Sequence, residues 1–371
     1  MRLTMGMGVA CVSVMTRAVS CQPRYGTPRT LERPTLGPAV GEVARLLGKP
    51  FMAWQQHVAY IILEIDPDSG GLAYPEFGLT VPRQSGKSTF LLAKAIHRAS
   101  ATKFFGPRQQ IVYTAQTRKD ARKKFEEDYA GVLEGSAYFR HKVDPRWGNG
   151  NEHIRLPNRS RFAIEANTEK AGHGPTLDEA YIDEAFAQVD ARLEQAFRPA
   201  MITRRNKQLG WISTAGWLDG SPYLQAKVKR GRDQAEMGVR EGLAYFEWSA
   251  PQDADPADES VWWSCMPALG HTVPIDAIRG VYESMVSEGN LAEFRRAYLN
   301  QWLDEVPAEW LVIPRETWMA LRAVPVSGGQ VALSADVSPR LPGRDVQGSI
   351  AASWRRPDGL TDVEIIAHQP G

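Results

Sequence analysis

Hydrophobic and polar positions follow two different periods along the first 250 residues of the chain. Apolar residues at helical spacing predict helices over residues 54–64 and 88–99, and a more highly charged helix over about 117–129. Short β-prone runs lie between them and predict strands over 79–81, 110–114, 180–182 and 209–213, with a hairpin over 153–156 and 161–165. Strands that alternate with helices indicate an α/β fold, in which helices flank a parallel sheet.

The pattern and the charge both change near residue 250. Residues 251–310 carry 11 acidic and 3 basic side chains, whereas 101–125 and 201–240 have net charges of +6 and +5. We therefore divide the chain into a Pro- and Gly-rich, irregular lead-in over 1–50, an α/β domain over 51–250, an acidic helical connector over 251–330, and a last unit over 331–371. The last unit holds three strand-like runs separated by Pro/Gly turns.

The composition excludes several classes of protein. The chain has 44 Lys and Arg against 43 Asp and Glu, which excludes a strongly basic, histone-like DNA binder but allows opposed charged patches. Three cysteines without metal-ligand spacing indicate neither a zinc site nor a disulfide framework, and a reducing cytosol fits them. No run approaches the roughly 20 apolar residues of a membrane span. Residues 1–21 faintly imitate a signal peptide, but Arg17 interrupts them, and we interpret them as a disordered leader.

A phosphate-binding loop is indicated between the strand that ends at Val81 and the helix that follows. The segment Pro82-Arg83-Gln84-Ser85-Gly86-Lys87-Ser88-Thr89 would direct backbone N–H groups and a helix N-terminus at a β-phosphate. Lys87 could then reach the β- and γ-phosphates, and Ser88 could ligate Mg²⁺. Val81 stands where the usual first glycine would be, and a Gly-Lys turn at an ordinary helix start is the alternative.

An acidic pair at the end of a later strand would complete such a site. The apolar run over 180–182 ends in Asp183 and Glu184. At the carboxyl edge of the sheet, Asp183 could hold Mg²⁺ through water, and Glu184 could polarise the attacking water. The pair Asp178-Glu179 competes for this role, but it lies close behind a proline and lacks the apolar run, so we interpret it as a solvated turn.

Two further kinds of residue belong to this hypothesis. Ser213 and Thr214 end the apolar strand over 209–213, where a hydroxyl group could sense the γ-phosphate. One arginine should also stabilise the transferring phosphoryl group. The loop itself places Arg83, whereas the sequence leaves four other candidates open: Arg118, Arg155, Arg159 and Arg161.

The joint set of motifs resembles the large terminase subunit of tailed double-stranded DNA bacteriophages. In that family the phosphate loop commonly reads P-R-Q-x-G-K-[ST], as residues 82–88 do, which accounts for Val81. Ile182-Asp183-Glu184 matches the acidic motif, and Ser213-Thr214-Ala215-Gly216 matches the coupling motif. Trp54-Gln55-Gln56 is similar to a W-Q element that precedes the phosphate loop in this family. Residues 293–302 are similar to the family's F-R-R-x-Y-L-N-Q-W signature. Residues 263–270 resemble the W-x-x-x-N-P-A-L-G segment, with Met266 in place of asparagine.

The resemblance implies a P-loop ATPase that drives genome packaging into a prohead in the host bacterial cytoplasm. It implies ATP and Mg²⁺ as cofactors, with Gln55 near the nucleotide base and Ser213 and Thr214 as coupling residues. The implied nucleotide contacts from the loop are Gln84, Ser85, Gly86, Lys87, Ser88 and Thr89. The implied partners are a small terminase subunit, a portal protein, other copies of the chain in a ring, and double-stranded DNA bound through its backbone.

The family also implies a metal-dependent nuclease domain of ribonuclease H type after the connector. Asp336, in the first strand-like run of the last unit, fits its first metal carboxylate, with Mg²⁺ or Mn²⁺ as the metal. Asp345 and Asp362 look like turn residues. The other carboxylates come from later strands in the family, so we expect the nuclease domain to be incomplete here and its activity to be doubtful.

Several interpretations stay open at the level of sequence. The basic run over 117–124 indicates a solvated helix face that pairs with Glu126, Glu127 and Asp128, or a surface that contacts DNA phosphates. His173 lies between two glycines and is interpreted as a loop residue. Two rival functions remain: another P-loop DNA translocase, such as a helicase, and a truncated prophage remnant that keeps the ATPase fold without activity.

Overall fold

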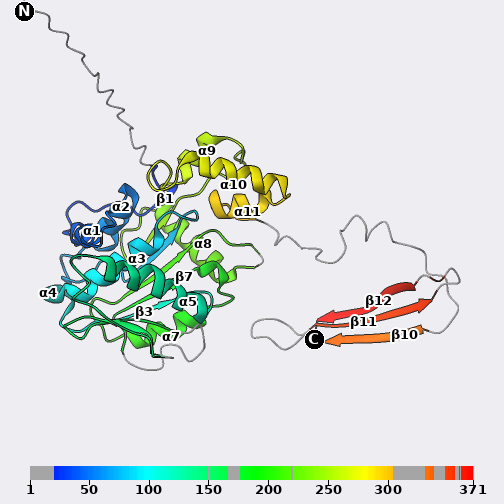
Figure 1. Cartoon of the computed structure of the whole chain (residues 1–371), viewed down its shortest axis with the longest axis horizontal. Coiled ribbons are helices and arrows are strands. Elements are labelled where there is room, and N and C mark those ends of the chain that lie inside the picture. The colour runs from blue at the N-terminus through cyan, green and yellow to red at the C-terminus, as the bar shows by residue number, and fades with distance from the viewer. Residues whose placement is uncertain are drawn as a thin grey trace, which may run out of the picture. The chain divides into compact units, whose positions relative to one another are not determined.

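The computed structural model describes residues 21–148, 151–165, 176–218, 220–303, 331–337, 347–355, 359 and 361–370. The chain divides into two compact units, Met1–Val306 and Pro307–Gly371 (Figure 1). The first unit contains both the α/β sheet and the helices of the acidic connector, so these two form one compact body. The boundaries that the sequence suggests at residues 50, 250 and 330 stay predictions.

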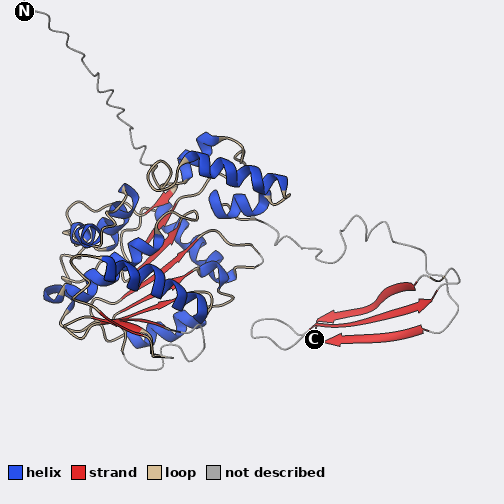
Figure 2. Cartoon of the chain, in the orientation of Figure 1, coloured by secondary structure: helices blue, strands red, loops and turns tan. Residues whose placement is uncertain are grey.

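The centre of the first unit is a mixed, mostly parallel sheet (Figure 2). The described residues form nine strands in the order β1-β9-β2-β8-β7-β3-β6-β5-β4. From β9 to β6 all neighbours are parallel, whereas β1, β5 and β4 pair antiparallel at the two edges. The strands are β1 Tyr25–Gly26, β2 Glu76–Thr80, β3 Gln110–Thr114, β4 Asp144–Arg146, β5 His153–Arg155, β6 Arg161–Ile164, β7 Glu179–Asp183, β8 Gln208–Ser213 and β9 Leu243–Glu247.

The sequence therefore predicted the α/β class, the parallel sheet and the hairpin of β5 and β6 correctly. The five residues of β2 and of β7 are all buried, as expected for strands covered on both faces. Gly78 of β2 lies opposite Trp211 of β8, and Phe77 lies opposite Gly210. A Cβ atom on Gly78 would come within 2.0 Å of the Trp211 ring. The close pairing of β2 with β8 therefore requires a glycine opposite each aromatic ring.

Helices cover both faces of the sheet and bury two separate cores. The first face carries α1 Gly37–Leu46, α2 Ala53–Ile62, α3 Lys87–Ser100, α5 Arg118–Lys124, a π-helical turn over Phe125–Ala130 and α6 Gly131–Gly135. The second face carries α7 Arg192–Met201 and α8 Pro222–Glu236. The short helix α4 Thr102–Phe105 follows α3, and a 3₁₀ turn over Ala185–Ala187 follows β7.

The expectation of an irregular lead-in over residues 1–50 was wrong in part, because α1 lies within it. Pro38 occupies the first turn of that helix, where a missing N–H costs nothing. Val40 and Ala44 are fully buried and belong to the same core as α2 and α3. The prolines of this segment therefore begin a helix rather than prevent one.

In the described part of the acidic connector, three helices follow β9 and form a third hydrophobic core, as expected. They are α9 Glu259–Cys265, α10 Ile275–Ser287 and α11 Leu291–Tyr298. Trp262 and Phe294 pack edge to face, with ring centroids 5.8 Å apart. Cys265 is buried as a free thiol in this core, and Cys21 is also a free thiol.

The second unit contains a three-stranded antiparallel sheet in the order β10-β11-β12. Its strands are β10 Val331–Val337, β11 Gln347–Arg355 and β12 Thr361–Pro370, which confirms the three strand-like runs. Asp336 lies in β10 opposite Ser349 of β11. The interpretation of Asp362 as a turn residue was wrong, because Asp362 lies in β12, where it is paired in register with Trp354 of β11. Asp345 lies outside the described residues. No helix in the described part of the chain is long and apolar enough to cross a membrane.

Candidate functional site

The loop between β2 and α3, which the sequence predicts to bind phosphate, contains two residues with left-handed backbone conformations. Gly86 adopts φ +87°, and a Cβ atom there would lie 2.9 Å from both the Gln55 amide nitrogen and the Met52 methyl group. Gln84 also has a positive φ, +57°, which is uncommon for a residue with a side chain. The Ser85 hydroxyl donates a hydrogen bond to the carbonyl of Pro82 at 2.8 Å and closes the turn from within.

Lys87, the first residue of α3, extends back over this loop. Its Nζ donates to the carbonyl oxygen of Val81 at 3.3 Å. Burial lowers the pKa of Lys87 to about 8, and the carboxylate of Asp183 partly opposes that shift. Lys87 and Asp183 are therefore close enough to interact although 96 positions separate them, as expected if both serve one site.

A cavity of about 710 Å³ opens beside this loop. Its lining combines the loop, the start of α3, the helical segment after β3 and the residue that follows β7. The lining residues are Leu47, Lys49, Arg83, Gln84, Ser85, Gly86, Lys87, Ser88, Thr89, Leu92, Lys124, Glu127, Asp128, Val132 and Glu184. All six loop residues predicted to contact a nucleotide thus line one cavity, together with Arg83 and Glu184.

Gln55 stabilises the phosphate loop from behind. Its Nε2 donates to the carbonyl oxygen of Gly86 at 2.9 Å, and its Oε1 accepts from the backbone N–H of Met52 at 2.7 Å. Gln55 is 1% exposed and is absent from the described lining of the cavity. The structure gives it a loop-positioning contact, and its expected contact with a nucleotide base stays a prediction.

Asp183 lies at the carboxyl end of β7, at the same edge of the sheet as the phosphate loop. Strand β8 separates β7 from β2, so the acidic residue is two strands away from the loop. Its Oδ2 accepts from the Tyr113 hydroxyl at 2.7 Å and from Lys124 Nζ at 2.5 Å. Burial by itself would raise the pKa of Asp183, but Lys124, Lys87 and the Tyr113 hydrogen bond together hold that pKa below its usual value.

Glu184 follows Asp183 in a left-handed conformation, with φ +52°. Its backbone N–H donates to Asp183 Oδ1 at 3.0 Å, which orients the turn. A non-glycine residue in this region stores strain, and such strain is concentrated at functional sites. The turn places Glu184 on the cavity wall while Asp183 stays fully buried.

Lys124 is a site residue that the sequence did not identify. It was assigned to the basic run over 117–124, with the acidic residues 126–128 as expected partners. In the structure Arg118 and Arg122 instead face the buried carboxylate of Glu152, whereas Lys124 contacts Asp183. Arg118 and Arg122 are four residues apart, so the sequence indicates that they share one face of the helix. No local pattern relates Lys124 to Asp183, which lies 59 positions further along the chain.

The interpretation of Asp178-Glu179 as a solvated turn was wrong. Glu179 is the first residue of β7 and is fully buried, with ion pairs to Lys94 and Arg98 of α3. Asp178 accepts from the backbone N–H of Gln110 at 2.7 Å and pairs with Arg204. These acids lie at the start of β7, so they belong to the opposite edge of the sheet from Asp183.

The predicted coupling residues connect the acidic turn with helix α11. Ser213 Oγ accepts from the backbone N–H of Phe186, just after Glu184, at 3.0 Å. Arg296 of α11 donates to the carbonyl oxygen of Ala215 at 3.0 Å and lies 3.4 Å from the Thr214 hydroxyl. The end of β8 is therefore attached both to the site and to the third core.

Helix α11 also contacts the phosphate loop directly. The backbone N–H of Arg83 donates to the carbonyl oxygen of Ala297 at 2.8 Å, and the Arg83 guanidinium lies 3.6 Å from Glu293. Glu293 binds Arg296 through both carboxylate oxygens at 2.6 and 2.8 Å. Glu293 therefore links the loop arginine to the arginine that holds the coupling residues.

The remaining arginine candidates lie elsewhere. Arg161 contacts Asn151 and His153 at the edge hairpin, and Arg155 and Arg159 are exposed. Arg118 is paired with Glu152. Among the five arginines that the sequence proposed, Arg83 is the one that lines the cavity in the described part of the chain. His173 lies outside the described residues.

The site contains a donor set suited to a magnesium ion that is shared with phosphate groups. Ser88 lines the cavity, and the lowered pKa of Asp183 keeps that carboxylate ionised near neutral pH. Within the described ranges, no group of three or more His, Cys, Asp or Glu side chains could hold a metal. Ser88 and Asp183 would thus need oxygen ligands from phosphate and water to complete a magnesium shell.

This chain is similar to one family of known proteins. Residues 79–216, which run from the end of β2 to the coupling segment, match the family described as "Terminase large subunit, T4likevirus-type, N-terminal". The resemblance to large terminase subunits is confirmed. No curated protein matches the chain.

Several solved structures of large terminases are similar to this chain. The large terminase of bacteriophage HK97 is similar over 90% of this chain and 67% of its own, with 21% identity and a TM-score of 0.58. The ATPase domain of the Thermus phage P74-26 large terminase is 18% identical over 69% of this chain and 96% of its own, with a TM-score of 0.46. The large terminase of a thermophilic bacteriophage, in complex with ADP, is 13% identical over 87% of this chain and 69% of its own, also with a TM-score of 0.46. The likeness to the HK97 protein supports the α/β fold.

Proposed function

We propose that this chain is the ATP-hydrolysing subunit of a phage DNA-packaging motor. The observation that carries the proposal is the arrangement of Lys87, Ser88, Arg83 and Glu184 around one cavity, with the ionised Asp183 buried beside it. A phosphate loop, a helix N-terminus and an acidic strand end are the parts that phosphoryl transfer to water requires. The match of residues 79–216 to large terminases supports this assignment.

In this mechanism each residue has a separate task. Lys87 and the loop N–H groups bind the β- and γ-phosphates, and Glu184 accepts a proton from the attacking water. Arg83 stabilises the negative charge that spreads over the γ-phosphoryl oxygens. Ser88 and Asp183 would hold Mg²⁺, which neutralises phosphate charge when it is bound.

The finer parts of the proposal concern what hydrolysis drives. We infer that Ser213 and Thr214 transmit loss of the γ-phosphate to helix α11 through Arg296, and that this motion translocates double-stranded DNA through backbone contacts. The proposed partners are a portal protein, a small terminase subunit and further copies of the chain in a ring in the host bacterial cytoplasm. Asp336 is the proposed first metal carboxylate of a DNA-cleaving second unit that uses Mg²⁺ or Mn²⁺.

Steady-state ATP hydrolysis with and without duplex DNA tests the proposal. The wild-type chain should hydrolyse ATP faster with DNA, whereas Lys87→Ala should lose at least about 100-fold in kcat/KM and keep its fold, because the lysine binds the transferring phosphoryl group. Lys229→Ala is a matched control, since Lys229 is exposed on α8 and does not line the cavity. Equal turnover by the Lys87→Ala and Lys229→Ala variants would show that this loop is not the nucleotide site.

A further inference from the structure

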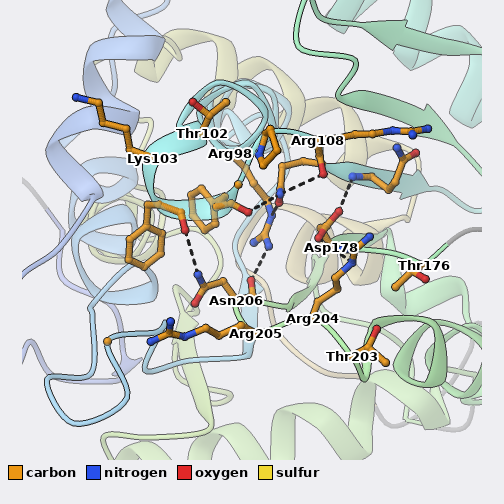
Figure 3. Close-up of a pocket in the computed structure, with 17 residues that line it drawn as sticks. Arg98, Thr102, Lys103, Arg108, Thr176, Asp178, Thr203, Arg204, Arg205 and Asn206 are labelled. Carbon is orange, nitrogen blue, oxygen red and sulfur yellow. Dashed lines mark hydrogen bonds and ion pairs between the residues drawn. The ribbon is translucent and has the colours of Figure 1, made fainter.

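Figure 3 shows a second cavity, whose volume is about 880 Å³. It lies at the edge of the sheet opposite the predicted phosphate loop. Its walls include the residues just before β3, β7 and β8, together with the end of α3 and the α4 segment. Parallel strands begin at a common edge and end at the other, so this cavity is separate from the one beside Lys87. No described residue lines both cavities.

The lining of this second cavity is strongly basic. Five cationic side chains contribute to it: Arg98, Lys103, Arg108, Arg204 and Arg205. Among its described lining residues, Asp178 has the single carboxylate. Three threonines, at positions 102, 176 and 203, add hydroxyl donors. A cavity with this balance of charge favours an anion with several oxygen atoms.

Two of the cations that line this cavity have no counter-charge among the described residues. The side chains of Lys103 and Arg108 are exposed and extend outward in Figure 3. Neither has an ion-pair partner in the part of the chain that the structure describes. Asp178 pairs with Arg204 at 3.2 Å, so the single carboxylate of the lining is already shared with one arginine and the backbone N–H of Gln110.

Arg98 provides a built donor in the interior of the cavity. Its side chain is 2% exposed and is held by hydrogen bonds to Gln109 Oε1 at 3.0 Å and to the carbonyl oxygen of Asn206 at 2.5 Å. Its Nε also lies 3.6 Å from the buried carboxylate of Glu179, so Arg98 contributes a donor more than an uncompensated charge. Its second terminal nitrogen, Nη1, is buried and has no hydrogen-bond partner among the described residues. A buried N–H group without an acceptor is costly, so this position favours a ligand oxygen that reaches Nη1 once the side chains that cover it shift.

We propose that this basic cavity binds a phosphate group at a site separate from the nucleotide site. Guanidinium groups and hydroxyls match the oxygen atoms of phosphate, and Arg98 Nη1 and the terminal nitrogens of Arg204 are the guanidinium donors that this recognition would use. The phosphate belongs either to a nucleic-acid backbone or to a free phosphate compound. The proposal goes beyond the ATPase assignment and does not depend on it.

The test uses the full chain with Lys87→Ala as the common background, which weakens phosphate binding at the first cavity. The probes are inorganic pyrophosphate, measured by calorimetry, and a short DNA duplex, measured by fluorescence anisotropy over a series of salt concentrations. Arg204→Gln should weaken binding about tenfold through loss of a charged hydrogen-bond donor. Asp178→Asn should strengthen it, because the amide oxygen still accepts from Gln110 while Arg204 is released for the ligand.

Arg240→Gln is the matched control, since Arg240 is exposed and lines neither cavity. If Arg204→Gln lowers the affinity for pyrophosphate and Asp178→Asn raises it, the site binds a free phosphate compound. If they change DNA affinity alone, with a salt slope about one unit smaller for Arg204→Gln, the phosphate is that of a nucleic-acid backbone. The proposal would be overturned if Arg204→Gln and Asp178→Asn bind each probe with the same affinity as Arg240→Gln. Melting curves of all three variants show whether each is folded.

Discussion

Lys124 Nζ lies 2.5 Å from Asp183 Oδ2, and the Tyr113 hydroxyl contacts the same oxygen at 2.7 Å. The ion pair joins the helix after β3 to the end of β7 and accounts for the low pKa of a fully buried carboxylate. Burial by itself would lower the pKa of Lys124, but the contact with Asp183 raises it. Asp183 is thus held ionised by the fold before any ligand arrives.

Replacing Lys124 should therefore destabilise the protein through Asp183. We expect Lys124→Gln to lower the free energy of unfolding by about 1–3 kcal/mol, because it leaves a buried carboxylate with fewer partners. The neighbouring Lys123→Gln is the control, since Lys123 is exposed and its side chain has no ion pair among the described residues. Chemical denaturation at neutral pH measures both variants, and equal losses would contradict a specific role of Lys124.

Glu293 should act on catalysis through the position of Arg83. Glu293→Gln removes the charge that holds the Arg83 guanidinium at 3.6 Å but retains an acceptor for Arg296. If Arg83 stabilises the transferring phosphoryl group, we expect kcat to fall about tenfold with little change in KM, because misplacing a catalytic group lowers the rate of the chemical step. Glu283→Gln on the exposed side of α10 is the control. A change in KM alone would argue against this role.

The buried Glu76 should make stability depend on pH in the acid range. Burial opposes its charge, but Lys227 and Arg198 lower the pKa of Glu76 from 4.5 to about 2. Since the folded pKa lies below the unfolded one, the stabilisation is fully present above about pH 4.5 and is lost as the pH falls toward 2. Its size is about 3 kcal/mol for a side chain that is 4% exposed.

The measurement compares wild type with Glu76→Gln by denaturant unfolding at pH 7 and at pH 3. The variant should have a lower free energy of unfolding than the wild type at pH 7. This difference should be smaller at pH 3, where the stabilisation from the ionised Glu76 carboxylate is partly lost. A constant difference between the two pH values would show that Glu76 contributes through packing or hydrogen bonding instead of charge.

Gly86 should not tolerate a side chain. Gly86→Ala would force a Cβ atom to 2.9 Å from Gln55 and Met52 at φ +87°, so we expect a loss of at least about 1 kcal/mol in stability and a weaker nucleotide affinity. Gly135→Ala is the control, because nothing lies within 4 Å of its Cβ position. Calorimetric titration with ADP and thermal melting test both. Unchanged ADP affinity in Gly86→Ala would separate this loop from nucleotide binding.

Much of the framework could be predicted from local sequence. Strand β3 was predicted over 110–114 and lies at Gln110–Thr114, and the helix predicted over 88–99 lies at Lys87–Ser100. Apolar period and turn residues suffice for such elements, because each depends on residues that are close along the chain. The lead-in was misread over α1, where Pro and Gly masked the buried stripe that includes Val40 and Ala44.

The sequence by itself determined the position of the loop between β2 and α3 and of the acidic end of β7, because both are short segments whose residue types dictate their conformation. The tertiary structure decided which charges meet: Lys124 with Asp183, Glu293 with Arg83, and Lys94 with Glu179, whose separation along the chain reaches 210 residues for Arg83 and Glu293. The edge of the sheet on which each acid lies also came from topology, which sets Asp183 and Glu179 at opposite ends of one strand. Ion pairs of this kind depend on the order of strands and the face each helix covers, and a linear pattern of residues contains neither.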